Sequence, residues 1–288
     1  MLRFLVLILL VSSCSEVKKD RGEELKGNVK SYEEISYKAI GLFGKIVKGN
    51  KLRDQNLEGS GMHDLYVVLD KNQNVTERRK YDSDGNLVYK TIYIYDKGGN
   101  ITEEKERNGG FTNYFYDKNG YLIQQDINHG SGSSQKWIYL NDNKGNKIEM
   151  KEFDFYNTLK YTNIYNYDEN GNQIEFLEYD KNHDLQSQVI FKYNEIGKKS
   201  EIYSSRKSLI MGKYDLYYGT FKSKYTYVYD EKGNVVLEMR YGKTDENETI
   251  LKLEYFYEYD KIGNWISKTI LENDEPQFIL ERKIDYYN

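Results

Sequence analysis

Apolar and polar residues alternate along most of the chain after Lys26, in short stretches separated by turn-forming residues. Aromatic residues stand two positions apart at the ends of many stretches, as Tyr227 and Tyr229 do. Alternation with a period of two is typical of strands, because successive side chains of a strand point to opposite faces. The spacing of an amphipathic helix does not persist anywhere after the first residues. The pattern therefore predicts an all-β chain.

The stretches are joined by a recurring unit, Tyr-Asp-x-x-Gly-Asn. It occurs at 81–86, 95–100, 167–172, 229–234 and 259–264, and at 116–121 with Tyr121 in the place of Asn. Asp at the first position of a type I turn accepts backbone hydrogen bonds, and Gly at the fourth adopts the left-handed conformation at little cost. Each unit therefore predicts a hairpin turn closed by a G1 bulge. The predicted turn residues are Asp82, Gly85, Asp96, Gly99, Asp117, Gly120, Asp168, Gly171, Asp230, Gly233, Asp260 and Gly263.

The spacing of the units is uneven, which matters for the architecture. Turn glycines lie between 14 residues apart (Gly85 to Gly99) and 36 residues apart (Gly197 to Gly233). A solenoid of stacked coils keeps a tight period, whereas an antiparallel strip tolerates hairpins of different length. Residues 70–75 and 179–184 are degenerate copies, the first with Gln73 in the Gly place. We interpret 48–62 as an irregular loop and 204–219 as an insertion.

The N-terminal segment predicts the cellular location of the protein. A positive start is followed by an apolar run from Phe4 to Val11, which is too short to span a bilayer. The next residues, Val11-Ser12-Ser13-Cys14, resemble the bacterial lipobox, in which the Cys is lipidated (with palmitate among the acyl chains) and becomes the mature N-terminus. Residues 1–13 are thus the predicted lipoprotein signal peptide, 14–25 a tether, and 26–288 a β-hairpin repeat domain. We expect the outer membrane of a bacterial envelope, with the periplasmic or surface face left open.

The Tyr-Asp-x-x-Gly-Asn units resemble YD repeats of the RHS (rearrangement hotspot) type, most clearly over residues 66–266. In that family the repeats form long, curved antiparallel β-strips, and in large members the strip encloses a C-terminal toxin. This chain is shorter, and its repeats run nearly to Asn288 with no cargo domain after them. The resemblance therefore implies an open, curved antiparallel strip that is not a closed shell, without a toxin role.

Composition limits the chemistry. Aromatic residues make up 15% of the chain, with 30 Tyr, which argues against disorder. A net charge of −4 gives no electrostatic case for nucleic acid. The histidines His63, His129 and His183 are scattered, Cys14 is the sole Cys, and no catalytic motif is present. We predict no enzymatic activity, no catalytic residues, no cofactor and no metal site.

Two sets of residues have both a structural and a functional interpretation. The turn aspartates would cap their own turns, although aligned acids also suit Ca²⁺. The Tyr stripes would pair across strands, although aromatic faces also stack on sugars. Trp137 and Trp265 are the candidates for glycan stacking. We favour the structural interpretation of both sets, because the pattern is regular along the whole chain, whereas a binding site is local.

These observations predict a non-enzymatic, lipid-anchored cell-envelope protein that contacts the membrane through Cys14. Its β-strip would serve as a protein-binding or scaffold surface, because exposed strand edges and aromatic surface favour association. The alternative is a carbohydrate-binding module for cell-wall or surface glycan.

Overall fold

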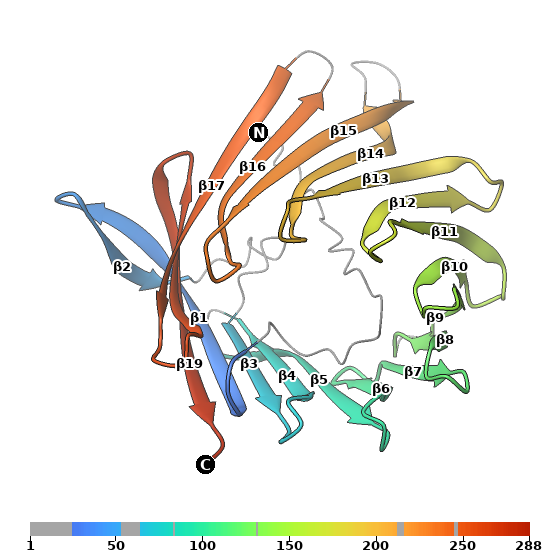
Figure 1. Ribbon diagram of the computed structural model, residues 1–288, viewed down its shortest axis with the longest axis horizontal. Coiled ribbons are helices and arrows are strands. Elements are labelled where there is room, and N and C mark those ends of the chain that lie inside the picture. Colours follow the sequence, from blue (N-terminus) through green and yellow to red (C-terminus); the bar gives the residue numbers. More distant parts are fainter. Residues whose placement is uncertain (1–24, 53–63, 83, 131, 212–215, 245–246) are drawn as a thin grey trace. The chain divides into compact units, whose positions relative to one another are not determined.

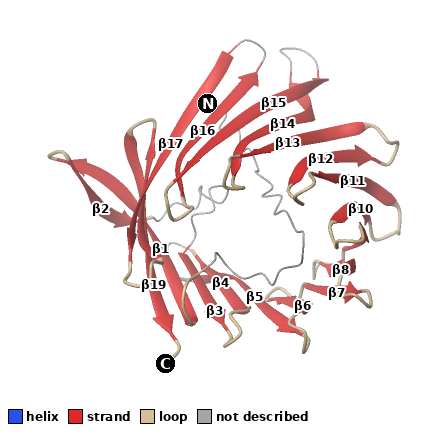
Figure 2. Ribbon diagram, in the orientation of Figure 1, coloured by secondary structure: helices blue, strands red, loops and turns tan. Residues whose placement is uncertain are grey.

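The computed structural model describes residues 25–52, 64–82, 84–130, 132–211, 216–244 and 247–288, and these ranges form strands and turns throughout (Figure 2). The all-β prediction is confirmed. Within the described ranges, no helix has the length and apolar character needed to cross a membrane. The predicted signal peptide and lipidation site Cys14 lie outside the described residues, as does His63.

The strands follow one another along the chain as labelled in Figure 1. Their bounds are β1 (Val29–Leu42), β2 (Lys45–Lys51), β3 (Asp64–Leu69), β4 (Val75–Tyr81), β5 (Leu87–Tyr95), β6 (Ile101–Glu106), β7 (Phe111–Tyr116), β8 (Leu122–Asn128), β9 (Ser134–Asn141), β10 (Lys147–Phe153), β11 (Leu159–Tyr167), β12 (Gln173–Asp180), β13 (Leu185–Tyr193), β14 (Lys199–Met211), β15 (Leu216–Tyr229), β16 (Val235–Thr244), β17 (Asn247–Tyr259), β18 (Trp265–Glu272) and β19 (Glu275–Tyr286).

The chain divides into two compact units. Unit 1 comprises Met1–Asn113, Phe256–Ile270 and Pro276–Asn288, and unit 2 comprises Tyr114–Tyr255 and Leu271–Glu275. Strands β7, β17, β18 and β19 each contain residues of both units.

Strand β1 organises unit 1. Its first half pairs with β19 on one side, with Tyr32 opposite Ile284, and with β3 on the other side, with Tyr32 opposite Val67. Its second half pairs with β2, with Ile40 opposite Val47. The fully buried side chains of this unit include Val29, Val67 and Val75.

Unit 2 is a meander in which each strand is antiparallel to its neighbours in sequence. Strands β14 and β15 pair continuously from Glu201 opposite Thr226 to Met211 opposite Leu216. The segment 204–219 therefore extends a regular hairpin and is not an insertion. In unit 1, the predicted irregular loop likewise begins inside a strand, because Lys48–Lys51 belongs to β2.

The prediction that the sheet is an open strip is wrong. The pairings run from β1 to β3, through each following strand to β19, and back to β1, with β2 attached to β1. This cycle closes the sheet into an 18-strand antiparallel β-barrel. Closure needs only that the first and last strands of the meander pair with each other, and strand alternation carries no information about that pairing. It also pairs the two end strands of the predicted strip with each other, and leaves the short strand β2 as the remaining edge of the described sheet.

Candidate functional site

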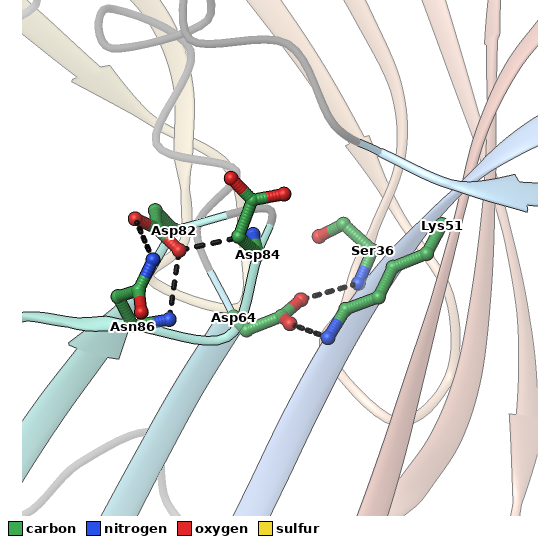
Figure 3. Close-up of polar contacts among 6 residues, drawn as sticks. All are labelled: Ser36, Lys51, Asp64, Asp82, Asp84 and Asn86. Carbon is green, nitrogen blue, oxygen red and sulfur yellow. Dashed lines mark hydrogen bonds and ion pairs between the residues drawn. The ribbon is translucent and has the colours of Figure 1, made fainter.

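The predicted turn aspartates each bond to their own turn, as Asp82 does in Figure 3. Asp82 Oδ1 accepts hydrogen bonds from the backbone N–H groups of Asp84 (2.9 Å) and Asn86 (2.8 Å), and Oδ2 accepts one from Asn86 Nδ2 (3.1 Å). Gly85 has φ of 81°. The bonds from Asn86 lower the pKa of Asp82, because they stabilise its charged form.

The same geometry recurs at the other predicted turns. The side chains of Asp96, Asp117, Asp168, Asp230 and Asp260 accept from the backbone N–H four residues on. The glycines Gly99, Gly120, Gly171, Gly233 and Gly263 all have positive φ. Because each carboxylate lies at its own turn, the described residues contain no cluster of three His, Cys, Asp or Glu side chains that could hold a metal ion.

Sequence reasoning missed the role of the Tyr in the repeat. Tyr95 donates its hydroxyl proton to the carbonyl oxygen of Val75 (2.6 Å), and Tyr193 donates to that of Gln173 (2.7 Å). Tyr167 and Tyr229 make the same type of bond. In each case the Tyr is the last residue of its strand, and the acceptor is the first residue of the strand immediately before it. The turn Tyr therefore ties consecutive hairpins together, which explains why the motif begins with Tyr and not Phe.

Trp265, one of the two predicted stacking residues, is covered by protein. Its side chain is 6% exposed, and the guanidinium of Arg282 lies 3.5 Å from its ring centroid. Arg282 in turn donates from Nε to Glu34 Oε1 (3.0 Å). A ring covered in this way has no exposed face for a sugar.

Trp137, the other predicted stacking residue, lies in unit 2 on β9, directly opposite Glu152 of β10. Its indole Nε1 is buried and has no hydrogen-bond partner among the described residues. Beside it, Gln135 donates from Nε2 to Glu152 Oε1 (3.3 Å). The indole N–H is a donor without an acceptor, which is a costly arrangement for a buried polar group.

A second unsatisfied group lies on the same face of the sheet. Asn163 is 6% exposed and stands opposite Met150 on one side and Glu178 on the other. Its Nδ2 contacts Met150 Sδ (3.9 Å), whereas its Oδ1 has no partner among the described residues. Directly opposite residues point to one face, so Asn163 and Glu178 converge there. Glu152 and Met150, two positions apart on β10, also share this face.

The two carboxyl groups are coupled electrostatically. Burial, and then the nearby charge of Glu178, raise the pKa of Glu152. Burial also raises the pKa of Glu178, while Arg206 opposes that rise. We call Trp137, Glu152, Asn163 and Glu178 the Trp137 site. It combines an indole donor, an amide acceptor and two half-buried acids, a set that can bond to hydroxyl groups in both directions.

The opposite face of unit 2 carries a charged cluster, which we call the Glu201 cluster: Lys192, Glu201, Tyr203 and Lys224. Glu201 accepts from Tyr203 Oη (2.7 Å) and pairs with Lys192 (3.0 Å) and Lys224 (3.2 Å). The hydrogen bond from Tyr203, followed by those from the two lysines, lowers the pKa of Glu201 to about 2. This face also exposes aliphatic side chains such as Ile138 and Leu140 on β9.

Among the described side chains, the face of unit 2 that carries the Glu201 cluster is not a continuous apolar band. On the face of the Glu201 cluster, Lys151 pairs with Glu149 (2.8 Å) and Lys252 with Glu254 (3.0 Å). A lipid-facing surface of a membrane barrel is apolar, and charged substitutions there are destabilising. The exposed aliphatic residues of this face therefore lie among ion pairs, as on a surface in contact with water.

No protein-family model matches the chain. No curated protein matches it. Solved structures that resemble it include TcdB2-TccC3, an RHS/YD-repeat toxin, at 12% identity and a TM-score of 0.39 over 76% of this chain and 14% of that one. They also include a porin-like protein from Bacteroides uniformis, at 11% identity and a TM-score of 0.42 over 91% of this chain and 98% of that one. The chain thus spans about one seventh (14%) of the length of the TcdB2-TccC3 chain.

The neighbours of this all-β chain thus include an RHS/YD-repeat protein and a porin-like protein. Likenesses with TM-scores of 0.39 and 0.42 transfer no function to the chain.

Proposed function

We propose that this chain is a non-enzymatic, lipid-anchored cell-envelope protein that binds glycan at the Trp137 site. The observation that carries the proposal is the pair of buried, unsatisfied groups on one face of unit 2, Trp137 Nε1 and Asn163 Oδ1. Glycan was the alternative in the sequence analysis. It now leads, because closure of the sheet pairs the end strands of the strip, which leaves the short strand β2 as the remaining edge for association with a protein.

A hydroxylated ligand suits the donors and acceptors of this site. A sugar hydroxyl accepts from the indole N–H and donates to the Asn163 carbonyl, so one class of ligand satisfies both groups. Glu152 and Glu178 accept from further hydroxyls. The negative charge of two neighbouring carboxylates disfavours an anionic ligand and leaves neutral saccharides favoured.

A glycan array on the purified, detergent-solubilised chain tests this proposal. We expect a selective signal that falls about tenfold or more in Trp137→Ala and in Asn163→Ala, since each change removes a group that the ligand would satisfy. Trp265→Phe, in unit 1, is the matched control and keeps the signal. An empty array, or a signal that survives both substitutions in unit 2, contradicts glycan binding at this site.

The same panel separates binding from catalysis. A non-enzymatic protein leaves the bound glycans intact, so no reducing ends appear over hours of incubation. Hydrolysis that disappears in Glu152→Gln or Glu178→Gln would overturn the non-enzymatic proposal, because two coupled carboxyl groups are also the catalytic apparatus of glycosidases.

The lipid anchor is tested separately. Cells grown with labelled palmitate should yield labelled protein, and Cys14→Ala should remove the label. An unlabelled parent protein would contradict the anchor without bearing on the glycan site.

A protein partner is the second candidate, and the Glu201 cluster favours it. Three hydrogen-bonded or ion-paired groups hold Glu201 in one geometry, and the Lys224 amine also lies over the Tyr203 ring (5.3 Å). A preorganised surface of this kind loses little entropy on association. We expect a partner captured from native membranes to be lost in Lys224→Glu and retained in Lys151→Glu, on the same face.

A further inference from the structure

The hairpin formed by β1 and β2 is the most exposed apolar part of unit 1. Its two-residue turn, Phe43-Gly44, has φ of 47° and 75°. Phe43 is 95% exposed and Leu42 is 50% exposed. We call the apolar residues at this end of the hairpin the apolar tip; they are Ile40, Leu42, Phe43, Ile46 and Val47, all exposed.

The hairpin runs beyond the strands that pair with β1. The β1–β19 pairing ends at Lys38 opposite Phe278, and the β1–β3 pairing covers only Ser31 to Glu34. Beyond these points β1 pairs with β2 alone. Figure 1 shows this blue hairpin extending past β3 and β19. A two-stranded ribbon is marginally stable in water, so its apolar tip favours an environment that covers it.

The base of the hairpin is held in place. Asp64, at the start of β3, accepts a hydrogen bond from the backbone N–H of Ser36 (3.2 Å) and pairs with Lys51 of β2 (Figure 3). Lys48 pairs with Glu281 of β19 (2.7 Å) and lies 4.5 Å from the ring centroid of Tyr37. The apolar tip is thus presented on a fixed stem.

Over the part of the hairpin in which β1 pairs with β2, the charged residues are all basic. Between Ser36 and Leu52 the sequence contains Lys38, Lys45, Lys48 and Lys51 and no acidic residue, although the whole chain has a net charge of −4. Lys45 directly follows the turn. Lys48 and Lys51 form ion pairs at the base of the hairpin, so Lys45 is the lysine placed to meet the headgroups. An apolar end flanked by this lysine is complementary to a bilayer with anionic headgroups, since the apolar residues enter the acyl region and the lysine amine stays among the headgroups.

We propose that the apolar tip of the β1–β2 hairpin inserts into a lipid bilayer that carries anionic headgroups. Strand addition by a protein is the less favoured occupant, because three lysines lie on β2, the exposed edge strand, and lysines on an edge oppose pairing with another strand. The inference is independent of the Trp137 site. It adds a second membrane contact to the proposed lipid anchor.

Vesicle flotation of the mature chain, residues 14–288, tests the proposal, with Cys14→Ser in every sample so that neither the predicted signal peptide nor the lipid anchor contributes. Phe43→Asp should reduce partitioning onto phosphatidylglycerol-containing vesicles about tenfold or more. Lys45→Glu should weaken binding to these vesicles but not to pure phosphatidylcholine. Asp adopts a left-handed backbone more readily than Phe does, so Phe43→Asp keeps the turn.

The chain offers a matched control in unit 2. Phe155 is 61% exposed in the turn after β10, beside Tyr156, but an acidic residue, Asp154, begins that turn. Phe155→Asp should therefore leave vesicle binding unchanged. Equal losses in Phe155→Asp and Phe43→Asp, or no loss in either, would overturn the proposal.

Tryptophan fluorescence provides a second measurement of insertion. Tryptophan emission from Phe43→Trp should shift to shorter wavelength when anionic vesicles are added, whereas that from Phe155→Trp should not. A shift that requires membrane-protein extract and is absent with vesicles would identify a protein occupant and refute insertion into lipid. Failure of palmitate labelling at Cys14 would leave either result intact, so the two proposals fail separately.

Discussion

The two turns at the ends of β12 have the same backbone hydrogen bonds, although His183 stands in the second turn where the first has Gly171. In the turn at 168–172, Asp168 N–H donates to the Asn172 carbonyl (2.9 Å) and Gly171 N–H to that of Asp168 (3.1 Å). In the turn at 180–184, the equivalent bonds run from Asp180 to Asp184 (3.0 Å) and from His183 to Asp180 (3.0 Å). Gly171 has φ of 84°, and His183 has φ of 65°.

The comparison shows that the Asp, and not the Gly, defines this turn. Asp180 Oδ1 accepts from the backbone N–H groups of Asn182 (2.9 Å) and Asp184 (3.0 Å), as Asp168 does in its own turn. The carboxylate therefore fixes the turn even where a residue with a Cβ must adopt the left-handed conformation. Gly lowers the conformational cost of the turn, by about 1–2 kcal/mol relative to other residues.

The largest expected effect comes from adding a β-branched side chain at the glycine. Gly171→Val should lower the free energy of unfolding by about 2 kcal/mol, because Val is strained at positive φ. An added Cβ would meet no atom within 4 Å, so the loss would be conformational and not steric. Urea denaturation measures it, with Gly171→Ala expected to lose about half as much. An unchanged midpoint for both variants would contradict a left-handed residue at this turn.

The sequence predicted the local structure well, for a physical reason. Strand alternation and the Asp-x-x-Gly turn depend on residues within a few positions of one another, so the all-β class could be predicted from short segments. Even the degenerate copies with Gln73 and His183 keep the turn, because the Asp that accepts the hydrogen bonds is present.

Closure could not be predicted in the same way. Tyr32 pairs with Ile284 across nearly the whole chain, and nothing in either strand specifies that partner. The Trp137 site has the same difficulty. The sequence analysis selected Trp137, but Glu152 and Asn163 join it only through the registers of β9, β10 and β11. The strand registers that close the sheet and assemble the Trp137 site are set by the lengths of the strands and turns in combination.

Acid should weaken the turns that carry Asp. Hydrogen bonds from Asn100, first from its backbone and then from its side chain, lower the pKa of Asp96 from 3.8. A depressed carboxyl pKa contributes stability above the unfolded value, and that stability is lost as the pH falls through the folded value. Stability should therefore decline below about pH 4. The turn at 194–198 already uses a neutral acceptor, because Asn194 Oδ1 accepts from the Lys198 N–H (2.8 Å).

Asp96→Asn tests this charge dependence. At neutral pH the variant should lose roughly 0.5–1 kcal/mol, because a neutral acceptor forms weaker hydrogen bonds than a screened carboxylate. Between pH 5 and 3 its free energy of unfolding should fall less steeply than that of the parent. Parallel pH profiles for the two proteins would show that Asp96 does not titrate differently in the folded and unfolded states.

The smallest expected effect comes from the opposite substitution, in which a glycine replaces a residue with a left-handed backbone. His183→Gly should raise the free energy of unfolding by about 0.5 kcal/mol, because relief of the left-handed strain exceeds the entropy cost of Gly in the unfolded chain. Gln73→Gly, at the equivalent position of unit 1, should instead be destabilising. The Gln73 side chain accepts from the Val29 N–H (3.0 Å) and donates to the Val29 carbonyl (3.0 Å), which joins the turn to β1. Denaturation midpoints that move in the same direction for both variants would show that strain alone governs the position.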